Sequence, residues 1–200
     1  MAALLLVTAA AASGCGGGGG STPVSAAKSP VKLDAAGELE PPRQAPEIAL
    51  RDWTGRQVRL SQYRGRAVML TFIYDHCPDT CPLIVEKLHQ ALVELGPRAH
   101  ELQIVAVSVD PRGDTPKTVK AFLIKHRMLG RMDYLIGTRA QLAPVWKAYD
   151  IASEASPEGR EVSHTALIYG ITGKGQQLAL YDQVFSPSEI VHDVPLLAGM

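Results

Sequence analysis

The sequence contains only three cysteines and no excess of either charge. Its 20 basic and 20 acidic residues give a formal net charge of zero. The basic residues are scattered among acidic ones, which argues against a protein that binds nucleic acid. Three cysteines, one of them at position 15, do not form a disulfide framework. The remaining close pair, Cys77 and Cys81, therefore indicates redox chemistry or a metal site.

The first 14 residues are predicted to be a signal peptide of the lipoprotein type. Their apolar segment, Ala2 to Ala12, has about half the length of a bilayer span, so it is not expected to be a transmembrane helix. Ala12-Ser13-Gly14-Cys15 resembles the bacterial lipobox, in which the chain is cut before the cysteine and the cysteine is lipidated. An ordinary cleaved signal, in which Cys15 has no role, stays open as the alternative.

The chain is expected to divide into a tether and one folded domain. Residues 15–44 include the run Gly16 to Gly20 and have no hydrophobic periodicity, which predicts a flexible tether rich in Gly, Ser and Pro. Residues 45–200 are long enough to bury a full core, because 46% of the sequence is hydrophobic. We expect this part to be a single domain.

The folded part alternates runs of β-forming residues with segments that have helical periodicity. It begins with a predicted β-hairpin over residues 48–60, and a polar connection is expected at 151–163. Strands are predicted at 67–74, 102–109, 134–136, 165–171 and 177–181, with helices beginning after residues 81, 115, 138 and 186. This order predicts an α/β fold, a thioredoxin-like three-layer sandwich whose central mixed sheet is flanked by helices.

Cys77 and Cys81 lie where the strand at 67–74 joins the next helix. At a helix N-terminus the backbone N–H groups favour an anion and lower the pKa of a thiol. Two sulfurs four residues apart can hold a metal between them or form a disulfide. Thiolates suit Cu(I) or Zn, and a nitrogen ligand extends the site to oxidised copper. His164, which opens a strand predicted near the pair, is the best candidate for the third ligand, and His76 is the rival.

Three motifs, in this order, resemble those of the Sco family, copper-binding thioredoxin-fold proteins that help assemble cytochrome c oxidase. They are Cys77 to Pro82 after an apolar strand, Ser108 to Pro111 with Asp114-Thr115 following, and Ser163 to Ala166. The resemblance covers about residues 46–185. It implies that Cys77, Cys81 and His164 coordinate copper, as Cu(I) or Cu(II). It also implies delivery of that copper to the dinuclear centre of oxidase subunit II.

The chain departs from the family's pattern at two positions near the pair. Asp75 stands where the family often has Thr, and Gly113 stands where it often has Arg. Neither change removes a ligand, but both alter the acidity of the pocket or the docking surface. Thioredoxins have a cis-proline opposite their redox pair, where this chain has His164. A ligand in place of that proline favours metal binding over thiol exchange.

The leading hypothesis is a membrane-anchored copper chaperone on the outer face of the bacterial cytoplasmic membrane, and not an enzyme in the turnover sense. Other copper chaperones or a thiol reductant are further expected partners. The rival hypothesis is a thiol:disulfide oxidoreductase that uses Cys77 and Cys81 as a redox pair. A peroxiredoxin-like peroxidase ranks low, because its Thr-x-x-Cys signature requires threonine where this chain has Tyr74. Asp75 and Asp79 are expected either to cap the helix or to attract a cation.

Overall fold

The computed structural model describes residues 32–155, 162–164 and 166–200, and it describes side chains for 32–152 and 166–200. The described strands are β1 (Gly37–Gln44), β2 (Ala49–Asp52), β3 (Gln57–Arg59), β4 (Ala67–Ile73), β5 (Leu102–Ser108), β6 (Met132–Ile136), β7 (Ser153–Ala155), β8 (Val162–His164), β9 (Ile168–Ile171) and β10 (Gln176–Tyr181). The α-helices are α1 (Thr80–Leu95), α2 (Pro116–Lys125), α3 (Arg139–Ala148) and α4 (Pro187–Gly199), and the short 3₁₀ helices are η1 (Leu60–Tyr63) and η2 (Gly96–Glu101).

A mixed sheet forms the centre of the fold, with the strand order β1-β10-β9-β4-β5-β6-β2-β3. The central strands β4, β5 and β6 are parallel, while β9 pairs antiparallel with β4 on one side and β2 pairs antiparallel with β6 on the other. Every residue of β4 and β5 is buried, as expected for strands that are covered on both faces. The prediction of a mixed sheet flanked by helices is confirmed.

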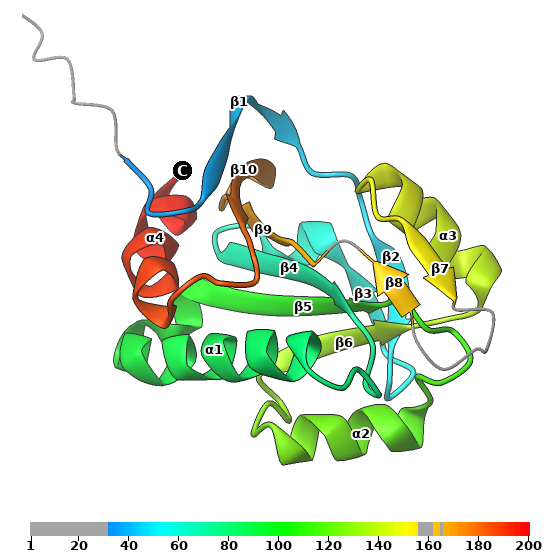
Figure 1. Cartoon of the computed structure of the whole chain (residues 1–200). Coiled ribbons are helices and arrows are strands. Elements are labelled where there is room, and N and C mark those ends of the chain that lie inside the picture. Colours follow the sequence, from blue (N-terminus) through cyan, green and yellow to red (C-terminus); the bar gives the residue numbers. More distant parts are fainter. Residues whose placement is uncertain (1–31, 156–161, 165) are drawn as a thin grey trace, which may run out of the picture. The chain divides into compact units, whose positions relative to one another are not determined.

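Helices cover both faces of this sheet (Figure 1). Phe72 of β4 packs against Tyr149 at the end of α3, with ring centroids 5.5 Å apart. Tyr134 aligns with Ala106, which in turn aligns with Thr71, the neighbour of Phe72 in β4. Successive residues of a strand point to opposite faces, so Tyr134 lies on the other face of the sheet from Phe72. There it packs against Phe122 of α2. Successive right-handed crossovers place α1 on the same face as α2, and α4 packs against α1. The molecule therefore has the three layers that the sequence predicts.

The folded unit begins earlier than predicted. The tether was expected to reach residue 44, but Gly37–Gln44 form β1, which pairs antiparallel with β10 at the edge of the sheet. Leu33 is buried in the core. This region is polar and contains two prolines, so its sequence has the composition of a tether, but pairing with β10 satisfies its backbone. The rest of the predicted tether, the signal peptide and Cys15 lie outside the described residues.

Other element boundaries also differ from the predicted ones. Part of the connection expected at 151–163 forms the strands β7 and β8, which pair with each other in a separate two-stranded sheet. The strand expected at 165–171 begins only at Ile168. Helix α3 contains Pro144 and extends to Ala148. The predicted N-caps Thr115, Thr138 and Ser186 are all confirmed.

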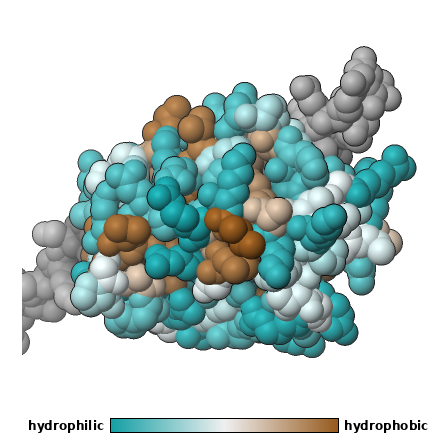
Figure 2. All heavy atoms as spheres, turned by 90° about the horizontal axis from the view of Figure 1, so that it is seen from below, coloured by the Kyte–Doolittle hydropathy of each residue, from teal (hydrophilic) through white to brown (hydrophobic). Residues whose placement is uncertain are grey.

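The surface carries only isolated hydrophobic side chains on the face turned toward the reader in Figure 2, where brown patches stand apart among hydrophilic residues. The large hydrophobic side chains that are exposed in the described residues are Leu83, Val93, Ile124, Leu129 and Val184. Scattered residues of this kind are usual on a monomer and do not define a docking face. Among the described helices, none has the length and the apolar character needed to cross a membrane.

Candidate metal centre

The two thiols lie where the central strand β4 gives way to α1. Cys77 is in the turn that leaves β4 and is half-buried, while Cys81 is the second residue of α1 and is fully buried. The helix is capped by Asp79, whose side chain accepts a hydrogen bond from the backbone N–H of Thr80. Of the two roles expected for Asp79, helix capping is therefore observed.

Hydrogen bonds converge on the sulfur of Cys77. The backbone N–H of Cys81 lies 3.3 Å from it, and no disulfide joins the two residues. The pKa of Cys77 falls to about 5, chiefly because the thiol of Cys81 donates a hydrogen bond to it. Backbone N–H groups of Cys81 and Asp79 and the side chain of Tyr74 act in the same direction, against the effect of burial. Cys77 is thus a thiolate at neutral pH.

The pKa of Cys81 shifts in the opposite direction. Its hydrogen bond to Cys77, followed by burial, raises its pKa well above the usual range of a thiol. The pair therefore consists of an accessible thiolate and a buried thiol that holds the shared proton. This arrangement suits two reactions, the binding of a soft metal ion after loss of that proton and the formation of a disulfide.

The backbone brings the segment of His164 to the same end of the sheet. His164 is the last residue of β8 and pairs with Ser153 of β7. The chain then enters β9 at Ile168, next to Thr71 near the end of β4. The carboxyl end of β4 and the amino end of β9 thus lie side by side, as predicted. The imidazole of His164 is outside the described side chains, so its role as a ligand stays a prediction.

A second group of polar side chains adjoins the thiols. Asp75, His76 and Asp114 each offer a ligand atom, and these atoms lie within 4.8 Å of one another. Asp114 accepts hydrogen bonds from the backbone N–H of Asp75 at 2.9 Å and from the hydroxyl of Tyr134 at 2.8 Å. Burial raises the pKa of Asp114 to about 7, against these hydrogen bonds. The sequence shows Asp114 only as part of a motif, because its contact with Asp75 spans 39 positions.

Asp110, in the same motif, has a structural role. Its carboxylate accepts hydrogen bonds from the backbone N–H groups of Arg112 and Gly113, both at 3.0 Å. This is an Asx-type turn, and it shapes the chain between β5 and α2. The turn leads to Asp114, whose carboxylate contacts the backbone of Asp75 in the loop that carries Cys77.

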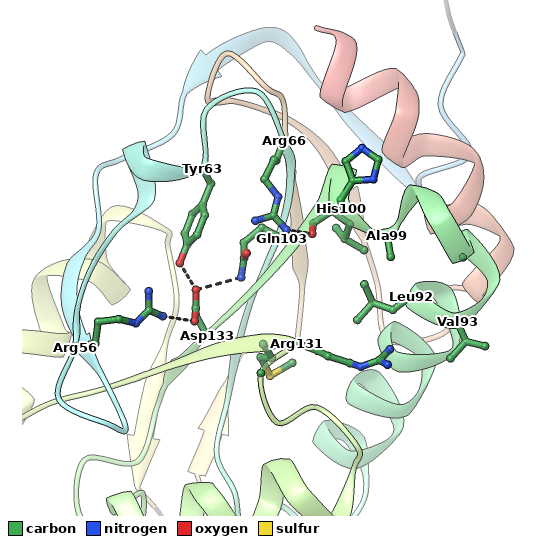
Figure 3. Close-up of a pocket in the computed structure, with 14 residues that line it drawn as sticks. Arg56, Tyr63, Arg66, Leu92, Val93, Ala99, His100, Gln103, Arg131 and Asp133 are labelled. Carbon is green, nitrogen blue, oxygen red and sulfur yellow. Dashed lines mark hydrogen bonds and ion pairs between the residues drawn. The ribbon is translucent and has the colours of Figure 1, made fainter.

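A second cavity lies away from the thiols. It has a volume of about 770 Å³ and is lined by side chains that include Arg56, Tyr63, Arg131 and Asp133. Figure 3 shows Arg56, Tyr63 and Gln103 converging on the carboxylate of Asp133. This cavity lies at the amino ends of β5 and β6. The thiols follow the carboxyl end of β4, and ligands in α/β sheets usually bind at the carboxyl ends of strands.

The family model described as SCO1/SenC matches residues 37–198. This chain belongs to the SCO1/SenC family. The match begins at the first residue of β1, in agreement with the structure rather than with the boundary predicted at residue 45.

Relatives and solved structures agree with this assignment. The chain is 31% identical over 156 residues to the mitochondrial protein SCO2 homolog of Bos taurus, covering 74% of this chain and 57% of that protein. Apo Sco1 of Thermus thermophilus is 26% identical, with a TM-score of 0.72 over 83% of this chain and 97% of that one. ScoI of Bradyrhizobium japonicum, solved with copper bound, is 27% identical, with a TM-score of 0.69 over 77% and 99%. The chain thus spans only about three fifths of the curated relatives it matches.

Proposed function

We propose that this protein is a copper chaperone that holds copper through Cys77, Cys81 and His164 and passes it to the dinuclear centre of cytochrome c oxidase subunit II. The observation that carries the proposal is the pair of thiols at the start of α1, in which the half-buried sulfur of Cys77 lies 3.3 Å from the backbone nitrogen of the buried Cys81, in a member of the SCO1/SenC family. Its relative from Bradyrhizobium japonicum binds copper in the solved structure.

The difference in exposure between the two thiols fits a delivery protein. Two thiolates form a soft site that favours Cu(I), and an imidazole extends the site to Cu(II). Cys81 is fully buried and would stay bound while Cys77, which is half-buried, faces an incoming partner. A ligand of the partner then replaces Cys77 first, and copper moves by exchange of one ligand at a time.

The same asymmetry supports a second candidate function, reduction of a disulfide in the target. The Cys77 thiolate attacks one sulfur of that disulfide, which forms a mixed disulfide and releases one target thiolate. Cys81 then loses its proton and attacks Cys77, releasing the second target thiolate and leaving this chain oxidised. A thiol reductant must restore the pair.

The cellular setting of the proposal rests on the sequence. Lipid attachment at Cys15 would anchor the domain to the outer face of the bacterial cytoplasmic membrane, next to a membrane-embedded oxidase. Other copper chaperones are the expected donors of the metal. These parts depend on Ala12 to Cys15, outside the described residues.

The test is copper binding by the full chain, reduced and anaerobic, with Cys15→Ser so that the pair holds the remaining thiols. We expect one copper per chain and, after oxidation to Cu(II), a sulfur-to-copper charge-transfer band. His164→Ala weakens the band, while the control His100→Ala, an exposed side chain that lines the distant cavity, leaves it unchanged. Absence of retained copper, together with a readily cycled Cys77–Cys81 disulfide, would transfer the function to the reductase candidate.

A further inference from the structure

The carboxylate of Asp75 is buried without the hydrogen bonds that a buried charge normally has. Its side chain is only 2% exposed, and neither carboxylate oxygen accepts a hydrogen bond. One oxygen faces Nδ1 of the adjacent His76 as an ion pair. This ion pair leaves the other carboxylate oxygen without a described partner. Buried carboxylate oxygens normally have one, so this oxygen has unused capacity to bind a cation.

The neighbours of Asp75 are arranged to share such a cation. Ligand atoms of Asp75, His76 and Asp114 lie within 4.8 Å of one another. Metal–ligand bonds of about 2 Å require ligand atoms within about 4 Å of one another, so the cluster must contract slightly to bind an ion, and the largely exposed ring of His76 is the least constrained of its side chains. Asp114 is held in place by Tyr134 and by the backbone of Asp75, so the cluster has a rigid base and one mobile ligand.

Two members of the cluster, Asp75 and His76, border a cavity of about 260 Å³ that Cys77 also lines. His126 lines the same cavity, is 8% exposed, and has a buried Nε2 atom with no hydrogen-bond partner. Two buried polar side chains with unsatisfied atoms thus border one small cavity. Unsatisfied polar atoms of this kind are sites for an ion or its bound water. The rest of the lining includes the apolar side chains of Pro82 and Phe122 and the basic side chain of Lys125.

Both departures of this chain from the Sco pattern fall at this place. Asp75 adds a carboxylate, and Gly113 omits a guanidinium next to Asp114. A Cβ atom at Gly113 would lie 2.2 Å from a carboxylate oxygen of Asp110, so a larger residue requires Asp110 to move. The two carboxylates of the cluster favour a cation, and Lys125 is the one basic residue other than histidine among the residues that line the cavity.

We propose that Asp75, His76 and Asp114 form a second metal site beside the thiol pair, which binds a divalent transition-metal ion such as Zn(II) or Cu(II). Two carboxylates and one imidazole suit these ions, whereas Cu(I) prefers the sulfurs of Cys77 and Cys81. The site is independent of the proposed copper function, because it uses none of that function's ligands.

The test uses the full chain with Cys15, Cys77 and Cys81 all changed to Ser, and cobalt(II) alone as the probe. We expect one cobalt per chain with visible d–d bands, no sulfur charge-transfer band, and displacement by zinc. Asp75→Asn and His76→Ala should each weaken cobalt binding at least tenfold. Cobalt should also raise the urea midpoint of the thiol-free protein but not that of its Asp75→Asn variant.

Matched controls come from Asp34 and His192, two exposed members of another Asp-His-Asp cluster, which also has ligand atoms within 4.8 Å. Asp34→Asn, His192→Ala and His164→Ala should leave cobalt affinity unchanged. The proposal is overturned if the thiol-free protein binds no cobalt, if Asp75→Asn binds it equally well, or if a control variant abolishes binding. Because the thiols are absent, a failure of the copper proposal does not affect this result.

Discussion

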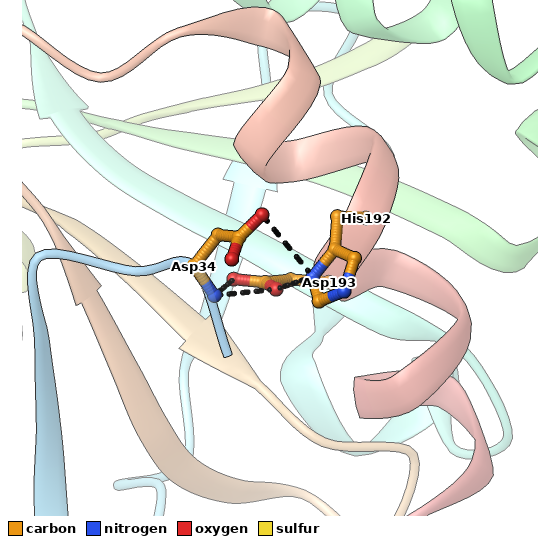
Figure 4. A group of neighbouring side chains, drawn as sticks. All are labelled: Asp34, His192 and Asp193. Carbon is orange, nitrogen blue, oxygen red and sulfur yellow. Dashed lines mark hydrogen bonds and ion pairs between the residues drawn. The ribbon is translucent and has the colours of Figure 1, made fainter. Parts of the chain in front are cut away.

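Two clusters in this protein have the same composition, one histidine and two aspartates, yet their buried carboxylates are held in different ways. Asp193 of α4 is fully buried and accepts hydrogen bonds from the backbone N–H groups of Asp34 at 2.8 Å and Ala35 at 3.0 Å (Figure 4). The hydroxyl of Tyr181 donates another at 2.8 Å. Asp75 is also buried, but no hydrogen bond reaches its carboxylate.

This difference distinguishes a structural tie from a candidate binding site. Asp193 holds the segment that leads into β1 against the last helix through hydrogen bonds. Both of its carboxylate oxygens accept hydrogen bonds. Asp75 ties no described backbone group, and it lies beside a reactive thiolate at the carboxyl end of the central strand. The two clusters have the same residue types and similar distances between ligand atoms. Only the hydrogen bonds to the buried carboxylate distinguish the structural cluster from the candidate metal site.

The largest effect is expected from Asp193→Asn. The NH₂ group of asparagine would face the N–H and O–H groups that donate hydrogen bonds to the carboxylate in the wild type. We therefore expect the free energy of unfolding to fall by about 3 kcal/mol. Urea unfolding measures it. His192→Ala, in which a half-exposed side chain is lost, should cost less than about 1 kcal/mol. Similar small losses for both variants would mean that Asp193 does not hold the N-terminal segment.

The same substitution at Asp75 should raise the free energy of unfolding instead of lowering it. Asp75→Asn removes a buried charge that accepts no hydrogen bond and whose ion pair is with the largely exposed ring of His76. The free energy of unfolding of the metal-free protein should therefore rise by at most about 1 kcal/mol. Urea unfolding in the presence of a chelator measures it. A loss of stability comparable to that of Asp193→Asn would show that the two clusters are held alike.

The thiolate beside the first cluster can be titrated by its rate of alkylation. With Cys15→Ser, the rate at Cys77 should reach half its maximum near pH 5, the pKa that the hydrogen bond from Cys81 gives it. Cys81→Ala removes that donor and should shift the midpoint to higher pH, while Asp193→Asn should not. A midpoint near 9, the ordinary value of a thiol, would contradict the thiolate assignment.

The smallest effect concerns His192 in the second cluster. Its hydrogen bond to Asp193 raises its pKa above 6.5, with help from Asp34. A histidine with a raised pKa in the folded state stabilises the protein below its unfolded pKa, and this stabilisation is lost as the pH rises through the folded pKa. The stability difference between wild type and His192→Ala should therefore shrink from pH 6 to pH 8. A stability difference that grows from pH 6 to pH 8 would contradict a raised pKa for His192.

Much of the fold was predictable because local signals agree with the tertiary structure. The apolar run at 67–74 forms β4, and Gly96, which has a φ of 52°, ends α1. The caps at Thr115, Thr138 and Ser186 begin α2, α3 and α4. These features depend on neighbours within a few residues, which a sequence displays directly.

The missed elements depend on distant partners. The strand β1 is polar and contains Pro41 and Pro42, and it is held by β10, more than 130 positions away. The position of the thiols at the start of α1 was predictable from the strand-to-helix join. The burial of the Asp75 side chain and its contact with Asp114 were not, because they follow from the turn through Asp110.

The central claim is that copper is held by Cys77, Cys81 and His164 rather than by the oxygen-rich cluster beside them. X-ray absorption at the copper edge, on the reduced full chain with Cys15→Ser and one copper per chain, tests it most directly. We predict two sulfur scatterers and one imidazole in wild type, with the imidazole lost in His164→Ala and kept in His76→Ala. A sulfur-free first shell that changes in His76→Ala would contradict the claim and place the copper at Asp75, His76 and Asp114.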